Sequence, residues 1–396
     1  MTLAPVVTAP YRRSISRIEG KCPTPGDAGR FVVSAIVSAY RAERFMRGLL
    51  EDLEAQTIAD RLEIIICDSN SPEDEAGIVR EFQERYDNIV YFRTPEREPS
   101  QVSFNRCIRI ARGRYLTMTN TDDRHRPDAL ERLARTLDER PDVGLVYGDL
   151  LITRRENETF ARNTADRALC YPPYSVRQSL MFCHFGPQAM WRANLGDDVD
   201  WFDESYSFAN DMDRYIDLAW RHGAVHVPEV LGLYFEGGFE EQHRDAVAAE
   251  SVAVATFHRT RIPLEDVYPG LKNGYAGDPV ARASALVDLG VALLGPPWPD
   301  PMMAQSRFRA ARALVDAPGI VCNVAVVDCL TGAVDRGRAL LEDLARQGSE
   351  LARHNLAALD GTGARSFNLF IASHPVVSEL APLWRPADCF RPWPMP

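Results

Sequence analysis

The chain has 396 residues, of which 45% are hydrophobic and 26% are charged, and its formal net charge is −11. This length allows two or three domains with a substantial core, and both fractions are typical of globular rather than disordered or fibrous proteins. The negative charge argues against nucleic acid or an anionic membrane as a partner, because both bind basic surfaces.

Cysteine usage and hydropathy indicate where the protein works. The eight cysteines are scattered, without a CxxC pair or zinc-type spacing, which is typical of reduced thiols. Residues 1–28 contain no apolar core of a secretory signal. No stretch approaches the roughly 18 consecutive apolar residues of a membrane span. We therefore expect an irregular leader over residues 1–28, no membrane span and a cytoplasmic location.

Strands and helices alternate from residue 29 onwards. The continuous apolar run FVVSAIVS (31–38) predicts a strand that is covered on both faces. A helical pattern of apolar residues follows it. The alternation continues with predicted strands at 62–68, 88–92, 115–120 and 143–149 and predicted helices at 72–86, 102–111 and 127–140. This order predicts right-handed βαβ units and a mostly parallel sheet, hence the α/β class.

The second half of the chain is less regular. Residues 156–180 lack periodicity and predict a loop-rich insert. Regular patterns return at 186–191, and the later ones predict a helix at about 211–222 and short strands at 224–228 and 232–235. Residues 261–280 are rich in proline and glycine, which predicts a linker. Helical patterns at 281–294, 307–316 and 336–359 hint at stacked helical hairpins. We thus expect an α/β domain over 29–260, a helical domain over 281–365 and a tail over 366–396.

Polar residues follow three of the predicted strands. Ligands of an open parallel sheet bind at the carboxyl ends of its strands. The residues placed there are Ser38, Ala39 and Tyr40, then Asp68 to Ser71, then Asn120, Thr121, Asp122 and Asp123. No glycine-rich phosphate loop follows the first strand, so neither a dinucleotide fingerprint nor a Walker loop is present. A nucleotide diphosphate would need another holder, and a metal ion on Asp122 would serve.

Three stretches resemble the inverting glycosyltransferases of family 2, which have the GT-A fold. They are LEDLEAQTIADRLEIIICDSNSPED, SFNRCIRIARGRYLTMTNTDDRHRP and DWFDESYSFANDMDRYIDLAWRHG. The resemblance covers roughly residues 31–240 and does not extend to the C-terminal third. It implies a GT-A catalytic domain followed by a C-terminal helical region, a nucleotide-sugar donor and a divalent cation.

The resemblance also implies residue roles. Tyr40 and Asp68 would contact the nucleoside, Asp122 would bind Mn²⁺ or Mg²⁺, and Asp211 would be the catalytic base. The implied nucleotide-binding set is completed by Ser38, Ala39, Asn105, Asn120 and Thr121, with Asp123 in the donor or metal region. His243 could supply a nitrogen ligand, although a solvated histidine at a helix start fits equally well.

Two departures from the family pattern concern the same region. Asn120 stands where the family usually has its first aspartate, and Phe104 stands where an arginine commonly precedes the helix asparagine. Asp211 also has an alternative, structural role: as a carboxylate in the first turn of a helix, it would interact favourably with the helix dipole. The choice of donor or the affinity for metal can therefore differ from what is usual in the family.

Three functions compete at this point. The first is metal-dependent transfer of a sugar, most commonly from UDP, to the hydroxyl of a glycan, protein, peptide or small molecule. The second is a non-catalytic protein that binds a nucleotide or a partner. The third, a sugar-phosphate nucleotidyltransferase, is disfavoured because its phosphates are commonly held by lysines, and the chain has only Lys21 and Lys272. The helical region could recruit the acceptor or form a homo-oligomer.

Overall fold

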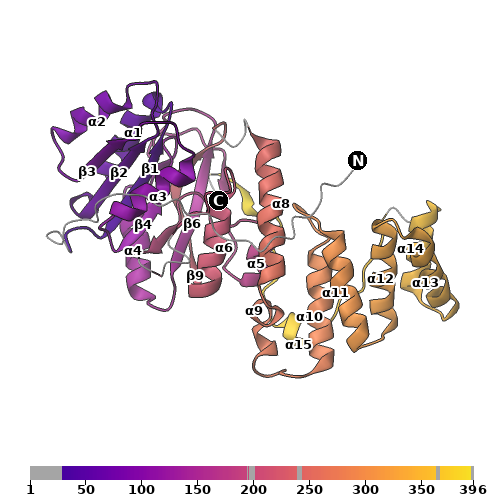
Figure 1. Ribbon diagram of the computed structural model, residues 1–396. Helices are drawn as coiled ribbons and strands as arrows, with labels where there is room; N and C mark the ends of the chain where they lie inside the picture. The colour runs from indigo at the N-terminus through magenta and orange to yellow at the C-terminus, as the bar shows by residue number, and fades with distance from the viewer. Residues whose placement is uncertain (1–28, 194, 196–200, 239–242, 363–365, 394–396) are drawn as a thin grey trace. The chain divides into compact units, whose positions relative to one another are not determined.

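The computed structural model describes residues 29–193, 195, 201–238, 243–362 and 366–393 (Figure 1). The predicted leader, residues 1–28, lies outside the described residues. Contacts divide the chain into two units. The first unit contains the residues up to Pro173, His184–Val254 and the segment from Cys389; the second contains Tyr174–Cys183 and Ala255–Asp388.

The first unit is built on a mixed sheet. Its strands run in the order β10-β7-β6-β8-β4-β1-β2-β3, with β9 paired to both β5 and β6. Strands β3, β2, β1 and β4 are parallel, as the alternating pattern predicted, and β8 is antiparallel to β4. The strand bounds are β1 Val33–Ala39, β2 Leu62–Asp68, β3 Ile89–Arg93, β4 Tyr115–Met118, β5 Arg124–His125, β6 Leu145–Thr153, β7 Arg167–Leu169, β8 Met190–Arg192, β9 Ala224–Phe235 and β10 Phe390–Pro392.

Helices cover both faces of this sheet. Alternate residues of β1 pack with apolar side chains of α1 (Glu43–Glu54), α2 (Glu75–Gln83) and α4 (Ala129–Glu139) in one core. On the other face, Cys107 of α3 (Ser100–Ile110) donates its thiol to the carbonyls of β1 and β2. Tyr215 of α6 (Asn210–His222) packs against Trp191 of β8, with ring centroids 5.8 Å apart. Because both faces are covered, the central strands are mainly apolar, and the buried Ser34 of β1 donates to Glu63 of β2.

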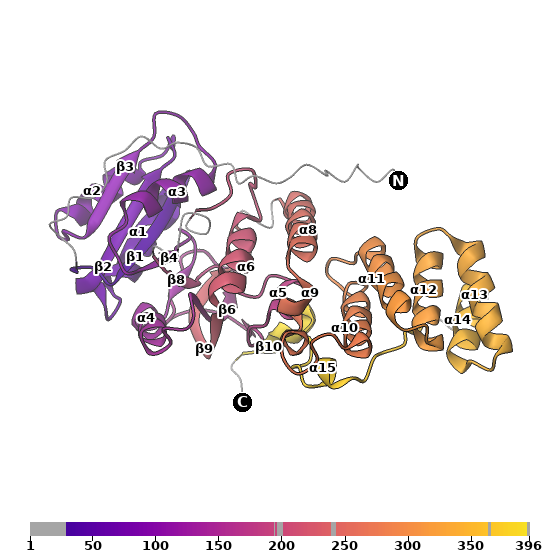
Figure 2. The same cartoon turned by 60° about the horizontal axis from the view of Figure 1, so that its bottom comes forward.

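Strand β9 differs from the prediction. The two short strands expected at 224–228 and 232–235 are one strand, Ala224–Phe235, which lies parallel to β6 (Figure 2). Its register against β6 shifts around Asp149, opposite the stretch that contains Pro228. Proline has no N–H for the ladder, so a bulge there lets the strand continue.

The second unit consists of helices. The main ones follow one another in a row and are α10 (Pro279–Ala292), α11 (Pro301–Leu314), α12 (Pro318–Leu330), α13 (Val334–Arg346) and α14 (Glu350–Asp360) (Figures 1 and 2). Helix α8 (Arg244–Arg261) leads into this unit, and α5 (Val176–Ser179) belongs to it. No helix within the described ranges is long and apolar enough to cross a membrane.

Two stretches of the second unit are more ordered than expected. The predicted linker 261–280 contains α9 (Leu264–Val267) and η3 (Pro269–Leu271), because the apolar residues at their ends are buried. The predicted tail 366–396 contains α15 (Pro375–Ser378) and η4 (Pro386–Cys389) and ends, within the described residues, in β10, which pairs with β7 of the first unit. Proline and glycine in these stretches mark turns rather than an unstructured connection.

Candidate active site

The ends of three strands meet at one edge of the sheet. Strand β1 lies between β2 and β4, so Ala39 is level with Asp68, and Ile36 is level with Met118. The backbone continues this pairing beyond the strands, since Ser69 N–H donates to the Ala39 carbonyl at 2.9 Å. The structure therefore brings the predicted residues 38–40, 68–71 and 120–123 to the same edge.

Asp68 is held by its neighbours at this edge. Its side chain is fully buried. One carboxylate oxygen accepts the Ser71 N–H at 2.7 Å. The other accepts the Tyr91 hydroxyl at 2.5 Å and the Arg93 guanidinium at 3.1 Å. These contacts fix the turn after β2, and a contact with a nucleoside base stays a prediction.

We expect Asp68→Asn to weaken binding of a free nucleoside such as uridine about tenfold, with or without metal, because a charge-assisted hydrogen bond is lost. Tyr91→Phe is the matched control, since it removes one support of the carboxylate and leaves the charge in place. Calorimetry with uridine measures both. If both variants bind uridine like the parent and lose only stability, Asp68 is structural.

The ring of Tyr40 contacts an arginine, Arg97, that was not predicted from the sequence. The Arg97 guanidinium carbon lies 4.2 Å from the centroid of the Tyr40 ring, within the range of a cation–π contact. Arg97 is exposed, in the loop after β3. It adds a positive charge beside the predicted nucleoside contact, in a chain whose net charge is negative. In the sequence, Arg97 is an arginine shortly after the end of a strand. Such arginines are too common for this pattern alone to identify a ligand contact.

The turn after β4 separates its two aspartates. Asp123 is buried, and its carboxylate accepts the Phe235 N–H of β9 and the Asn120 amide, each at 3.1 Å. Asp122 is only half-buried, and a side chain on Gly238 would collide with its carboxylate. Asp123 thus anchors the turn, while Asp122 is the carboxylate at the sheet edge.

A buried arginine supports this turn. The Arg124 guanidinium donates to the carbonyls of Thr121 and Asp123, at 2.9 and 2.6 Å, and to Asn157 at 2.9 Å. Its path is open because Gly48 of α1 has no side chain; a Cβ there would lie 2.5 Å from the guanidinium. Arg124 therefore fixes the backbone that presents Asp122. Sequence reasoning missed this role because Asn157 and Gly48 are distant in the chain.

The aspartate pair has perturbed acidity. Burial, and then the charge of Asp122, raise the pKa of the Asp123 carboxyl to about 8. Burial also raises the pKa of Asp122, although the positive charges of Arg124 and Arg44 act in the opposite direction. The protein thus compensates only partly for negative charge at this poorly hydrated turn, which favours a cation at Asp122.

The raised pKa of Asp123 predicts a pH dependence of stability. The folded chain keeps this proton up to about pH 8, whereas the ordinary value is 3.8. Because the folded state binds more protons between these values, this carboxyl lowers the free energy of unfolding as pH rises, by at most about 1.4 kcal/mol per pH unit. We expect Asp123→Asn to flatten that decline. Urea unfolding of parent and variant between about pH 5 and 8 measures it; parallel profiles would contradict it.

Asn105 has a different environment from the one predicted. Its amide nitrogen donates to the Phe202 carbonyl at 2.9 Å and to Glu204 at 3.1 Å, and its oxygen accepts the Phe202 N–H at 2.8 Å. The side chain is fully buried. These bonds attach α3 to the segment that leads into α6. A direct contact with the nucleotide stays a prediction, and these bonds argue against it.

Asp211 lies in the first turn of α6. Its carboxylate is half-buried and accepts the Met212 N–H at 2.7 Å. The loop before the helix is fixed from outside, because Glu250 of α8 accepts the N–H groups of Ser207, Phe208 and Ala209 at 2.6 to 3.0 Å. Glu250 is thus a positioning residue for the helix start that the sequence did not reveal.

Two further residues lie near parts of the candidate site. Gly238 lies against Asp122, and the His243 ring lies 5.3 Å from the ring of Phe208. Across the described ranges, no three His, Cys, Asp or Glu side chains meet in a way that could hold a metal ion. A cation held by one carboxylate and substrate phosphates fits this arrangement, since Mg²⁺ is commonly bound in that way. The role of His243 as a ligand stays a prediction.

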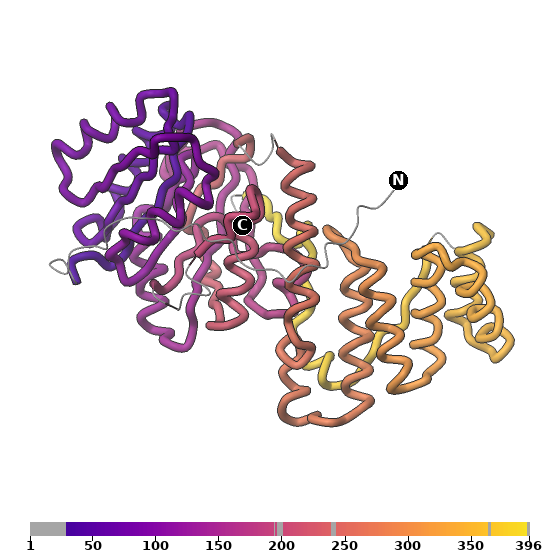
Figure 3. The backbone as a smooth tube through the Cα atoms, in the orientation of Figure 1, coloured from indigo at the N-terminus to yellow at the C-terminus, as the bar shows by residue number. Residues whose placement is uncertain are grey.

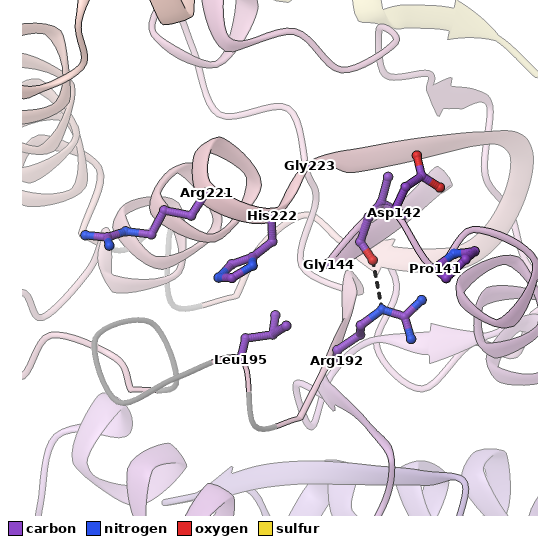
Figure 4. A pocket seen from close by; sticks show the side chains of 9 residues that line it. Pro141, Asp142, Gly144, Arg192, Leu195, Arg221, His222 and Gly223 are labelled. Carbon is purple, nitrogen blue, oxygen red and sulfur yellow. Dashed lines mark hydrogen bonds between the residues drawn. The ribbon is translucent and has the colours of Figure 1, made fainter.

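A pocket of about 390 Å³ lies elsewhere in the first unit. It is lined by Gly144 and Gly223, which directly precede β6 and β9, and by Arg192, Arg221 and His222 (Figure 4). Arg192 turns its guanidinium to the Val143 carbonyl at 2.9 Å. The pocket is therefore at the amino ends of these strands, away from the predicted residues, and it is not part of the candidate site.

The segment that forms this edge matches a known family. Residues 34–195 match the family described as Glycosyl transferase family 2. Over these residues the chain is similar to the family 2 glycosyltransferases. The match includes Tyr40, Asp68 and the turn 120–123, and it ends before Asp211. The resemblance to family 2 predicted from the sequence is thereby confirmed, whereas the domain bounds and the roles of individual residues remain predictions.

Curated relatives agree with this match. The chain is 30% identical to the chondroitin synthase of Escherichia coli over 191 residues, which are 48% of this chain and 26% of the relative. It is 32% identical to the putative glycosyltransferase EpsH of Bacillus subtilis over 111 residues, 28% of this chain and 32% of the relative. The chain thus spans about a quarter to a third of the length of these relatives.

The fold is also found among solved structures. Residues 1–349 of TarS from S. aureus, crystallised with UDP, superimpose with a TM-score of 0.50 at 15% identity, covering 81% of this chain and 92% of that one. At this identity the likeness concerns the fold alone. The first unit has the expected GT-A fold, a mostly parallel sheet, and the C-terminal helices follow it.

Proposed function

We propose that the chain transfers a sugar from a nucleotide sugar, with UDP as the nucleotide, to an acceptor hydroxyl and inverts the anomeric centre. The observation that carries this proposal is the edge formed by β1, β2 and β4, where the half-buried Asp122 stands beside the anchored Asp123. The UDP complex of the TarS fragment supports the choice of nucleotide.

The donor side uses the strand ends. Tyr40 and Asp68 would hold the nucleoside, and Arg97 would add positive charge beside Tyr40. Asp122 would hold Mn²⁺ or Mg²⁺ together with the diphosphate. When bound, such an ion neutralises negative charge on a departing nucleoside diphosphate. Arg124 keeps the turn in place through backbone carbonyls, so the position of Asp122 does not depend on a ligand.

The acceptor side uses the start of α6. Asp211 would take the proton of the acceptor hydroxyl while that oxygen bonds to the anomeric carbon and the bond to the diphosphate breaks on the opposite face. A single displacement of this kind inverts the anomeric centre. Glu250 keeps the helix start in position by accepting three backbone N–H groups, so the carboxylate of Asp211 is presented from a fixed turn.

A thermal-shift screen of nucleotide sugars with and without Mn²⁺ tests this proposal. A ligand at 100 times its Kd stabilises the folded state by about 2.7 kcal/mol. We expect a UDP-sugar to raise the melting temperature, and to raise it more when Mn²⁺ is present. A screen in which no nucleotide sugar shifts the melting temperature in the presence of Mn²⁺ would contradict the proposal.

A further inference from the structure

Two buried asparagines of the second unit bind the backbone of a later segment of the chain. Asn355 of α14 donates to the carbonyl of Asn368 at 2.8 Å and accepts its N–H at 2.7 Å. Asn323 of α12 does the same with Phe370, at 2.9 and 2.7 Å. Both asparagine side chains are fully buried. Each side-chain amide therefore takes the place of a neighbouring strand.

The two asparagines occupy equivalent places in successive hairpins. Each is the sixth residue of its helix, since α12 begins at Pro318 and α14 at Glu350. They contact alternate residues, 368 and 370, and two residues of extended chain advance about 6.6–6.8 Å. The corresponding residue of α10 is Ser284, which bonds within its own helix. The asparagine pair is thus a repeated device for an extended backbone.

One side chain of the bound segment is also accommodated. The ring of Phe370 lies over Gly319 in the first turn of α12, where a Cβ would come within 2.5 Å of the ring. By contrast, Asn368 is exposed, and 67% of Ile371 is exposed. The surface of α12 and α14 therefore binds the backbone and one aromatic ring of this segment, whereas the side chains of Asn368 and Ile371 stay exposed.

The bound segment is attached independently beyond this surface. Figure 3 shows the C-terminal part of the chain running back along the row of helices. Helix α15 follows the segment, and Gln178 of α5 binds both backbone groups of Trp384, at 2.8 and 3.0 Å. The chain beyond residues 366–371 therefore has contacts of its own that do not involve the asparagine pair.

We propose that α12 and α14 form a docking site for an extended polypeptide segment of a partner protein with one aromatic residue, and that residues 366–371 occupy this site until the partner displaces them. The hydrogen bonds that support this proposal are made to main-chain atoms, which every polypeptide has. Removing the occupant without replacement would take both hydrogen bonds from the buried Asn323 amide and leave the buried Asn355 amide with only the Cys322 sulfur, at 3.3 Å, so exchange of one strand for another is favoured over an empty surface. The proposal is independent of the glycosyltransferase reaction.

A labelled peptide with the sequence of residues 366–374, SFNLFIASH, tests the docking site on the full chain. Phe370→Ala weakens the resident segment and leaves the asparagine pair intact, so we expect this variant to bind the peptide. The parent should bind it at least about tenfold more weakly, because its own segment is present at an effective concentration near millimolar. Fluorescence anisotropy measures both.

N-methylated peptides test whether the site recognises the peptide backbone. N-methylation of the peptide at the position of Phe370 removes the N–H that Asn323 accepts and should weaken binding at least about tenfold, as should Asn323→Ala in the variant chain. N-methylation at the position of Leu369, outside the two asparagine contacts, should change binding less than about threefold. Equal effects at the two positions, or no binding to a folded Phe370→Ala chain, would overturn the proposal.

A second measurement uses the unaltered chain and covers the case in which Phe370→Ala does not fold. Excess unlabelled peptide should accelerate hydrogen exchange of the resident amides at 368 and 370, because displacement exposes them to solvent. The N-methylated Phe370 peptide should not. Unchanged exchange at millimolar peptide would show that residues 366–371 are a fixed part of the fold and would refute the docking site.

Discussion

Replacing Asp211 by asparagine should lower sugar transfer by about 10²–10⁴-fold, because general-base catalysis contributes that much. Donor and metal binding should stay nearly intact, since the base acts only on the acceptor. Asparagine keeps the size of the side chain and can still accept the Met212 N–H, so the melting temperature should change little. Turnover, donor affinity and melting temperature of this variant are the measurements.

Asp217 provides the matched control on the same helix. Its carboxylate is buried and pairs with Arg221 at 3.1 Å, so Asp217→Asn should cost stability and leave the turnover of the folded enzyme unchanged. If Asp211 served only the helix dipole, its variant would behave like the Asp217 variant. Near-parental turnover of Asp211→Asn would end its assignment as the base.

Replacing Asp122 by asparagine should abolish the dependence of nucleotide binding on metal. Asp122 is the carboxylate at the sheet edge, whereas Asp123 is committed to Phe235 and Asn120. Calorimetry of UDP with and without Mn²⁺ on the folded variant measures this. We expect the parent to bind more tightly with Mn²⁺ and the variant to bind equally with and without it.

Glu156 is the control for the change of charge. It is exposed, pairs with Arg44 at 3.0 Å and contributes to the negative field at Asp122. Glu156→Gln removes one negative charge nearby and should keep most of the metal dependence. Undiminished Mn²⁺-dependent affinity in Asp122→Asn would refute the metal assignment and leave residues 120–123 as an ordinary turn.

The sheet and its edge were predictable because local patterns determine them. Strand β2 was predicted with its observed bounds, Leu62–Asp68, since the largely β-branched apolar run 64–67, ended by an aspartate, is typical of a buried strand. The predicted helix at 211–222 corresponds to α6 (Asn210–His222) for a similar reason. Residues that follow buried strands directly, such as Asp68 and Asp122, could therefore be placed at one edge.

Other features depend on partners that are distant in the chain. Helix α12 was missed because its residues Ile320–Asp328 are all buried, so its sequence lacks the alternation of an amphipathic helix. Glu250 and Arg124 look like ordinary surface charges in the sequence. Their roles follow only from the N–H groups of 207–209 and the carbonyls of the Asp122 turn, which folding brings to them.

The stereochemistry of donor hydrolysis tests the central claim most directly, because it requires no acceptor. Incubated with Mn²⁺ and a UDP-sugar whose anomeric bond is α, the enzyme should slowly release the β anomer of the free sugar, seen by proton NMR before mutarotation. Asp122→Asn should release little. Initial release of the α anomer, or equal hydrolysis by parent and Asp122→Asn, would contradict a metal-dependent inverting transferase.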